Sequence, residues 1–208
     1  MNKEIEIKIK INKEILDRFV KDKSNFKFEK TYGYFTENYE NITKGIFPRI
    51  KDMGNVALVS VKIKTQNDSK MFERDEYEFE IDSKKVGAAR LMFGALGYCI
   101  EHIFEKRRYE LESINNCDFV IDELSFGYFI ELEGTEEDIE KSIKELGLKN
   151  NERINGAYLK LWEKYKKENN LPPLDDIRWQ EIIKSKKGFI KKIWEIIHKE
   201  ALKIEKKI

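Results

Sequence analysis

The first strand-like segment of the chain carries a charge pattern that few folds accommodate. In the segment EIEIKIKI, residues 4–11, successive side chains point to opposite faces of an extended strand. One face therefore carries only isoleucines, whereas the other carries two glutamates followed by two lysines. The isoleucine face is expected to pack into a core, so the fold depends on what surrounds the charged face.

The same alternation recurs through the first two-thirds of the chain. Turn-forming residues such as Asp52, Gly54 and Asn67 separate several of the alternating segments. Together with residues 4–11 these segments predict eight strands. The other seven are residues 26–35, 45–51, 55–64, 71–81, 105–113, 117–124 and 127–134.

Helical periodicity is expected between and after the strands. Asn12, Asp82 or Ser83, and Thr135 are candidate N-caps for the first three helices. We expect one α+β domain over residues 1–180 and a lysine-rich helical extension over 181–208 that packs on it or projects from it. The predicted helices cover residues 13–22, 84–97, 136–148, 156–170, 175–185 and 187–208.

The overall charge argues against a general nucleic-acid binder. The chain of 208 residues has 40 basic and 39 acidic residues, a formal net charge of only +1. A protein that coats nucleic acid without sequence preference needs a clear basic excess. Charged residues form 38% of the chain and aromatic residues 12%, which is typical of a globular protein with a highly charged surface or interior.

The sequence gives little support for a disulfide framework, a histidine or cysteine metal site, or a membrane location. Cys99 and Cys117 are expected to be reduced thiols, and the lone His102 and His198 are expected to pack or to face solvent. No apolar run approaches the roughly 20 residues of a membrane span, and the N-terminus has no signal-peptide pattern. The sequence thus predicts a cytoplasmic protein without a membrane partner.

Two arrangements account for the charged strand faces. In the first, an open antiparallel sheet packs on helices and its charges face water. In the second, the eight strands close into a barrel whose interior holds the charges. Acids and bases inside a barrel need partners, because each desolvated charge costs several kcal/mol. A complex of Mg²⁺ or Mn²⁺ with a triphosphate satisfies both, since carboxylates bind such cations and Lys or Arg binds phosphate.

Six elements then appear in a familiar order. They are Glu4-x-Glu6-x-Lys8, FPRIK (47–51), VSVKIK (59–64), RDEYEFEI (74–81), EKRRYEL (105–111) and IDELSFGYFIELEG (121–134). This order resembles the CYTH superfamily of triphosphate tunnel metalloenzymes, from the ExExK signature to the final ExE hairpin. That superfamily includes class IV adenylyl cyclases, thiamine triphosphatases and inorganic triphosphatases. The resemblance covers residues 1 to about 180 and implies an α+β fold around a closed, eight-stranded antiparallel barrel with flanking helices.

The resemblance also implies a role for each matching residue. Tyr34 is similar to a tyrosine that lies beside the signature lysine in some members, and Tyr32 is a competing alignment for that position. The expected catalytic group is Glu4, Glu6, Lys8 and Tyr34. The expected metal ligands are Glu4, Glu6, Asp122, Glu131 and Glu133. The expected phosphate-binding residues are Lys8, Arg49, Lys51, Lys62, Arg74, Lys106 and Arg108, with Glu76 and Glu78 as supporting acids.

The expected function is a triphosphatase that depends on Mg²⁺ or Mn²⁺. Its substrate would be a small molecule, either inorganic, thiamine or nucleoside triphosphate, with no specific nucleic acid as partner; a homodimer is left open. A class IV adenylyl cyclase is the alternative, although the chain has no room for the His-Phe element that precedes Glu4 in many cyclases. A module that binds polyphosphate or nucleotide without turnover is a third reading. Tyr158 and Trp162 are expected only to pack the helices.

Overall fold

The computed structural model describes residues 2–35, 44–64, 72–98, 100–171 and 177. For residues 2–4, 35, 72, 100 and 101 it describes the backbone alone. The helix expected over 187–208, and with it the C-terminal extension, lies outside the described residues.

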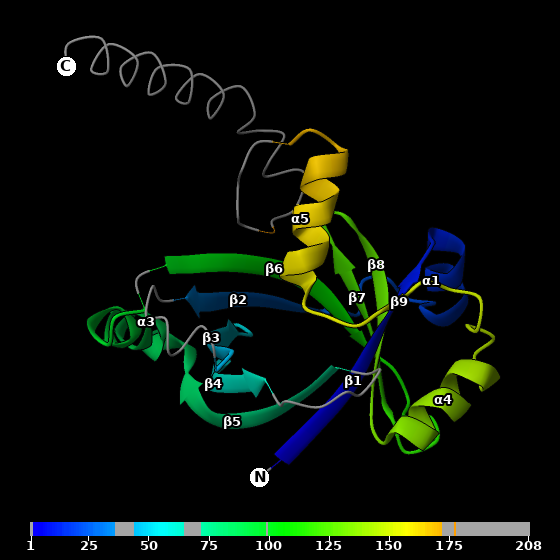
Figure 1. Cartoon of the computed structure of the whole chain (residues 1–208), viewed down its shortest axis with the longest axis horizontal. Coiled ribbons are helices and arrows are strands. Elements are labelled where there is room, and N and C mark those ends of the chain that lie inside the picture. Colours follow the sequence, from blue (N-terminus) through cyan, green and yellow to red (C-terminus); the bar gives the residue numbers. More distant parts are fainter. Residues whose placement is uncertain (1, 36–43, 65–71, 99, 172–176, 178–208) are drawn as a thin grey trace.

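Eight antiparallel strands close into a barrel, which confirms the α+β barrel and excludes the open sheet. Around the ring the order is β5, β4, β3, β2, β6, β7, β8 and β1, and β1 pairs again with β5. Figure 1 shows β2 and β6 on one side of the ring and β4 and β5 on the other. The strands are β1 (Asn2–Ile11), β2 (Lys27–Phe35), β3 (Ile46–Asp52), β4 (Val56–Lys64), β5 (Phe72–Asp82), β6 (Ile100–Glu110), β7 (Asp118–Leu124) and β8 (Gly127–Glu133).

Seven of these strands begin and end within two residues of the predicted segments, and β6 does not. It begins at Ile100 and ends at Glu110, whereas residues 105–113 were expected. The short strand β9 (Arg153–Ile154), which pairs with β1, was not predicted.

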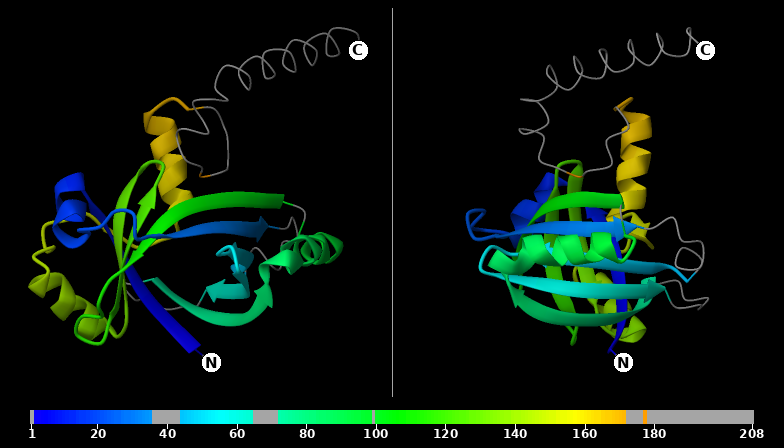
Figure 2. Two further views of the ribbon diagram at one scale, coloured as in Figure 1. Left: turned by 180° about the vertical axis from the view of Figure 1, so that it is seen from behind. Right: turned by 90° about the vertical axis from the view of Figure 1, so that its left-hand side faces the viewer.

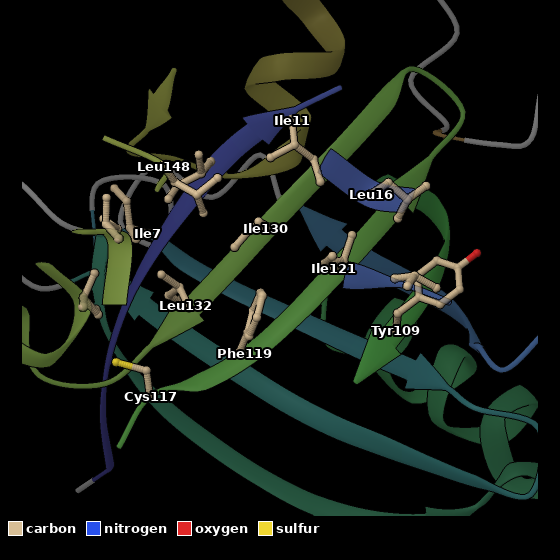
Figure 3. Close-up of a cluster of buried hydrophobic side chains, with 14 residues drawn as sticks. Ile7, Ile11, Leu16, Tyr109, Cys117, Phe119, Ile121, Ile130, Leu132 and Leu148 are labelled. Carbon is tan, nitrogen blue, oxygen red and sulfur yellow. The ribbon is translucent and has the colours of Figure 1, made fainter. Parts of the chain in front are cut away.

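The isoleucines of the first segment lie outside the barrel, where a hydrophobic core forms. Ile7, Ile9 and Ile11 pack with residues of β7, β8 and the helix α4 (Glu136–Glu145) in one buried cluster. Figure 3 shows Ile7, Ile121, Ile130 and Leu132 within that cluster. Since side chains alternate along a strand, burying these isoleucines directs Glu6 and Lys8 into the barrel.

Two capped helices cover this outer face. The helix α1 (Lys13–Phe19) begins where Asn12 Oδ1 accepts a hydrogen bond of 2.9 Å from Ile15 N. Thr135 caps α4 in the same way, accepting from Asp138 N at 3.2 Å. Both predicted caps are therefore confirmed.

A third helix covers another part of the barrel surface. The helix α3 (Val86–Ala95) follows a short 3₁₀ turn, Ser83–Lys85, and packs Val86 and Phe93 against β2, β3 and β4. Figure 2 shows this helix against the barrel from two sides. Asp82 caps this turn by accepting from Lys84 N. In the described part of the chain, no helix is long and apolar enough to cross a membrane.

The helix α5 (Tyr158–Glu168) covers the barrel where β6 and β7 separate. Strand β7 pairs with only residues 107–110 of β6, and Trp162 of α5 packs with Leu124 and Phe129 beside that opening. Ile177 forms a parallel bridge to Phe104 of β6. The helix expected over 175–185 is therefore wrong at Ile177, which is paired as a strand.

Candidate active site

The barrel interior contains a cavity of about 310 Å³ lined by charged side chains from seven of the eight strands. The numbers of cationic and acidic side chains are nearly equal there, so the cavity is not a binding site for anions alone. The cations are Lys8, Arg49, Lys51, Lys62, Arg74, Lys106 and Arg108, and the acids are Glu6, Glu29, Glu76, Glu78, Glu131 and Glu133.

One wall of the cavity is formed by β1 and β8. Glu6 and Glu133 are cross-strand partners, as are Lys8 and Glu131. Lys8 Nζ lies 2.6 Å from Glu6 Oε1 and 3.6 Å from Glu131 Oε2. Burial lowers the pKa of Lys8, but Glu131 and Glu6 outweigh burial and raise it. The ammonium thus stays charged between the two carboxylates.

A buried carboxylate orients the cations of β6. Asp122 is 0% exposed, and it accepts two hydrogen bonds of 2.7 Å from Arg108, through Nε and Nη2. Lys106 Nζ donates to the same carboxylate at 2.9 Å and lies 3.2 Å from Glu29 Oε2. Burial raises the pKa of Glu29, but the positive charges of Lys106, Arg108 and Lys51 outweigh burial and lower it to about 2. Glu29 is therefore ionised at neutral pH.

A second carboxylate orients the cations of β3 and β4. Glu76 accepts from Arg49 Nη2 at 2.7 Å and lies 3.0 Å from Lys62 Nζ. Burial raises the pKa of Glu76, whereas Arg49 and Lys62 lower it, with a net result of about 2. Arg74 Nη2 donates to Glu6 at 2.8 Å. Each of these cations is thereby held at the cavity wall.

Lys51 is the exception among the cations. Within the described part of the chain it makes no ion pair, although Glu29 is near enough to raise its pKa. Burial lowers the pKa of Lys51 more strongly, and the positive charges of Arg49, Lys106 and Arg108 lower it further. An anion bound among these four side chains, Lys51, Arg49, Lys106 and Arg108, would reduce the electrostatic repulsion between their positive charges.

The structure brings most of the predicted site residues together. Asp122 lies behind Arg108 rather than at the cavity surface, and its predicted role as a metal ligand stays a prediction. Glu4 is paired with Arg74 through the backbone of β1, but its side chain lies outside the described part. The predicted residues that line the cavity are Glu6, Lys8, Arg49, Lys51, Lys62, Arg74, Glu76, Glu78, Lys106, Arg108, Glu131 and Glu133.

Tyr34 is not beside Lys8, and this prediction is wrong. It is 2% exposed and packs on Phe93 of α3, with ring centroids 4.9 Å apart, outside the barrel. Tyr32 shares that outer cluster, because residues two apart on a strand face the same side. The tyrosine near the signature lysine is instead Tyr158, whose ring centroid is 5.2 Å from Lys8 Nζ.

Two ionisable cavity residues were missed, Tyr158 and Glu29. The Tyr158 hydroxyl donates to Asp122 at 3.0 Å, and burial together with Asp122 and Glu131 raises its pKa well above the usual value. Helical spacing alone marked it as a packing residue. Glu29 had a visible signal, since alternation in FKFEKTYG places it opposite Phe28 and Lys30.

One end of the cavity is apolar. Phe47 and Phe104 line it and lie directly over Gly33 of β2. A Cβ atom at Gly33 would lie 2.6 Å from Phe47 and 2.9 Å from Phe104, so a larger residue would push the rings into the cavity. The charged part of the cavity therefore adjoins an aromatic wall.

The carboxylates of β1 and β8 have the oxygen chemistry that Mg²⁺ or Mn²⁺ requires. Within the described ranges, however, no three Asp, Glu, His or Cys side chains are arranged closely enough to hold a metal ion. Lys8 lies between Glu6 and Glu131 instead. A divalent cation bound by these acids would have to displace the Lys8 ammonium.

Comparison with known proteins supports the fold. No family model and no curated protein matches this sequence. The PH1819 protein of Pyrococcus horikoshii aligns over 77% of this chain and 98% of its own, at 22% identity and a TM-score of 0.57. A Bacillus halodurans protein, provisionally named an adenylate cyclase, covers 76% of this chain and 96% of its own, at 17% identity and a TM-score of 0.55.

A third solved structure has the same architecture. The Hippeastrum protein HpAC1, provisionally an adenylyl cyclase and reported to have a dominant triphosphatase activity, covers 84% of this chain and 99% of its own. It is 18% identical, with a TM-score of 0.55. The chain thus has the barrel fold found in proteins named as cyclases or triphosphatases.

Proposed function

We propose that this chain is a divalent-metal-dependent triphosphatase of the CYTH type, which binds a small triphosphate inside the barrel. The observation that carries the proposal is the cavity itself, where seven cations from five strands surround a wall with three acids on β1 and β8, and three further acids lie on β2 and β5. Such an arrangement suits a polyanion that carries a cation of its own. The structural likeness to HpAC1 supports the same class of reaction.

Phosphate binding is assigned to cations that the protein already holds in place. Glu76 fixes Arg49 and Lys62, and Asp122 fixes Arg108 and Lys106. Donors that are fixed before the substrate arrives need no reorganisation as charge develops in the transition state. Lys51 adds a cation without an ion pair within the described part of the chain.

Metal binding is assigned to Glu6, Glu131 and Glu133, with Glu4 as the fourth carboxylate of the two ExE pairs. A bound Mg²⁺ or Mn²⁺ would neutralise phosphate charge and lower the pKa of a coordinated water. The Lys8 ammonium, once displaced from Glu6 and Glu131, is close enough to the cavity to donate to a phosphate oxygen. The remaining lysines and arginines stabilise the charge on the transferred phosphoryl group.

Adenylyl cyclase activity is the second candidate. Phe47 and Phe104 form an aromatic wall next to the phosphate-binding cations, and such a wall suits a nucleobase or another organic ring. Both the Bacillus halodurans protein and HpAC1 are provisionally named as cyclases. Hydrolysis and cyclisation would use the same cavity and differ in which oxygen attacks.

A product panel tests the proposal. We expect the parent protein to release phosphate from tripolyphosphate, thiamine triphosphate or ATP with Mg²⁺ or Mn²⁺, and to lose this activity when the metal is chelated. Glu4→Gln/Glu6→Gln should lower turnover by about 1,000-fold without unfolding, because ligands are lost while the size of the side chains is kept.

The matched control replaces two exposed glutamates outside the cavity, Glu14→Gln/Glu137→Gln, and should keep the parent rate. Cyclic AMP as the main product from ATP would favour the cyclase instead. Binding of tripolyphosphate without any product would favour a non-catalytic module.

A further inference from the structure

Tyr158 connects two strands of the barrel to α5, the helix that covers the place where β6 and β7 separate. It is the first residue of α5, and its ring packs on Phe129 of β8 with centroids 5.3 Å apart. Its hydroxyl oxygen lies 3.0 Å from Asp122 Oδ2 on β7 and 3.4 Å from Glu131 Oε2 on β8. The start of α5 also contributes Ala157 and Leu159 to the cavity lining, and the Tyr158 hydroxyl is the polar side-chain group that it adds.

The two carboxylates that Tyr158 contacts lie on different strands and share Arg108 as a partner. Asp122 also accepts hydrogen bonds from Arg108 and Lys106, which face the phosphate-binding side. Glu131 lies on the acidic wall, 3.6 Å from Lys8 Nζ, and it also accepts from Arg108 Nη2 at 3.2 Å. Tyr158 therefore lies where the cation group and the acidic wall meet.

Packing alone does not account for the hydroxyl. The ring packs on Phe129, and a phenylalanine would make that contact as well. A buried hydroxyl loses its water and needs a hydrogen-bond partner within the protein. Here it donates to a carboxylate that already has two cationic partners. Tyr165 on the same helix packs on Trp162 and Phe126 and does not line the cavity.

We propose that Tyr158 is a positioning residue of the triphosphate site. Its hydroxyl, together with Arg108, bridges Asp122 and Glu131, and its ring lies against Lys8. Asp122 in turn directs Arg108 and Lys106 into the cavity. This inference rests on the proposed function, and it makes correct docking of α5 a condition for tight phosphate binding.

The test compares Tyr158→Phe with Tyr165→Phe in the full chain. Each variant removes one phenolic hydroxyl from α5 and keeps the ring. For Tyr158→Phe we expect the dissociation constant of tripolyphosphate, measured by calorimetry, and the KM for it to rise about 10-fold. Tyr165→Phe should keep both values. A purely structural role would instead lower the melting temperature and the active fraction, with both values unchanged.

The outcomes separate this inference from the function itself. If Tyr158→Phe binds tripolyphosphate as tightly as the parent, or if Tyr165→Phe weakens binding equally, Tyr158 has no positioning role. If the parent binds and hydrolyses triphosphate in either case, the proposed function stands while this inference falls. If the parent neither binds nor hydrolyses any triphosphate, both fall together.

Discussion

The double variant Lys62→Met/Glu76→Gln is expected to lose about 100-fold in kcat/KM for tripolyphosphate while it unfolds within about 4 °C of the parent. Lys62 is a buried cation held 3.0 Å from Glu76. Removing one positive and one negative charge leaves the net charge of the interior unchanged, and replacing a buried ion pair in this way is often neutral for stability. The amide oxygen that Glu76→Gln introduces would still accept a hydrogen bond from Arg49. The lost cation is therefore expected to affect phosphate binding rather than folding.

Steady-state phosphate release and thermal unfolding measure the two effects separately. The matched control is Asp17→Asn/Lys23→Met, which removes an ion pair from the exposed surface. It should change neither quantity. Parent activity in Lys62→Met/Glu76→Gln would show that this pair is structural and that the phosphate lies elsewhere.

Replacing Asp122 by leucine is expected to lower the free energy of unfolding by about 3–5 kcal/mol. Asp122 is fully buried and bonded to Arg108, Lys106 and Tyr158. Without its carboxylate the two cations lose their common partner in a desolvated place. The cost is mainly that of leaving buried charge uncompensated.

Urea unfolding of Asp122→Leu and Asp118→Leu provides the comparison. Asp118 lies on the same strand but is exposed, so its replacement should change stability by less than about 0.5 kcal/mol. Equal stability of Asp122→Leu and the parent would mean that the β6 cations do not depend on Asp122.

Local alternation was sufficient to predict most of the barrel. In β1 the sequence itself separates Ile7 and Ile9 from Glu6 and Lys8, and burying one set directs the other inward. In β6 the signal fades over residues 100–104, because His102 and Phe104 on one face do not contrast with Ile103 on the other. The start of that strand was therefore missed.

Contacts between distant segments were not predictable in this way. Ile177 pairs with Phe104 because β7 leaves that edge of β6 unpaired. The residues around Ile177 give no sign in the sequence that this edge is available. Which tyrosine approaches Lys8 likewise depends on how α5 docks on the barrel. Tyr34 matched the family's tyrosine only by its position along the chain, and it lies in an outer cluster. Tyr158 lies beside Lys8 because of the tertiary packing of α5.

The most direct measurement of the central claim is the melting temperature in the presence of tripolyphosphate and Mg²⁺. The paired charges inside the closed barrel are predicted to bind this complex, so a concentration 100 times the dissociation constant should raise the melting temperature by about 5–10 °C. Glu4→Gln/Glu6→Gln should show a much smaller rise. An unchanged melting temperature of the parent up to millimolar tripolyphosphate, with and without Mg²⁺, would contradict the account.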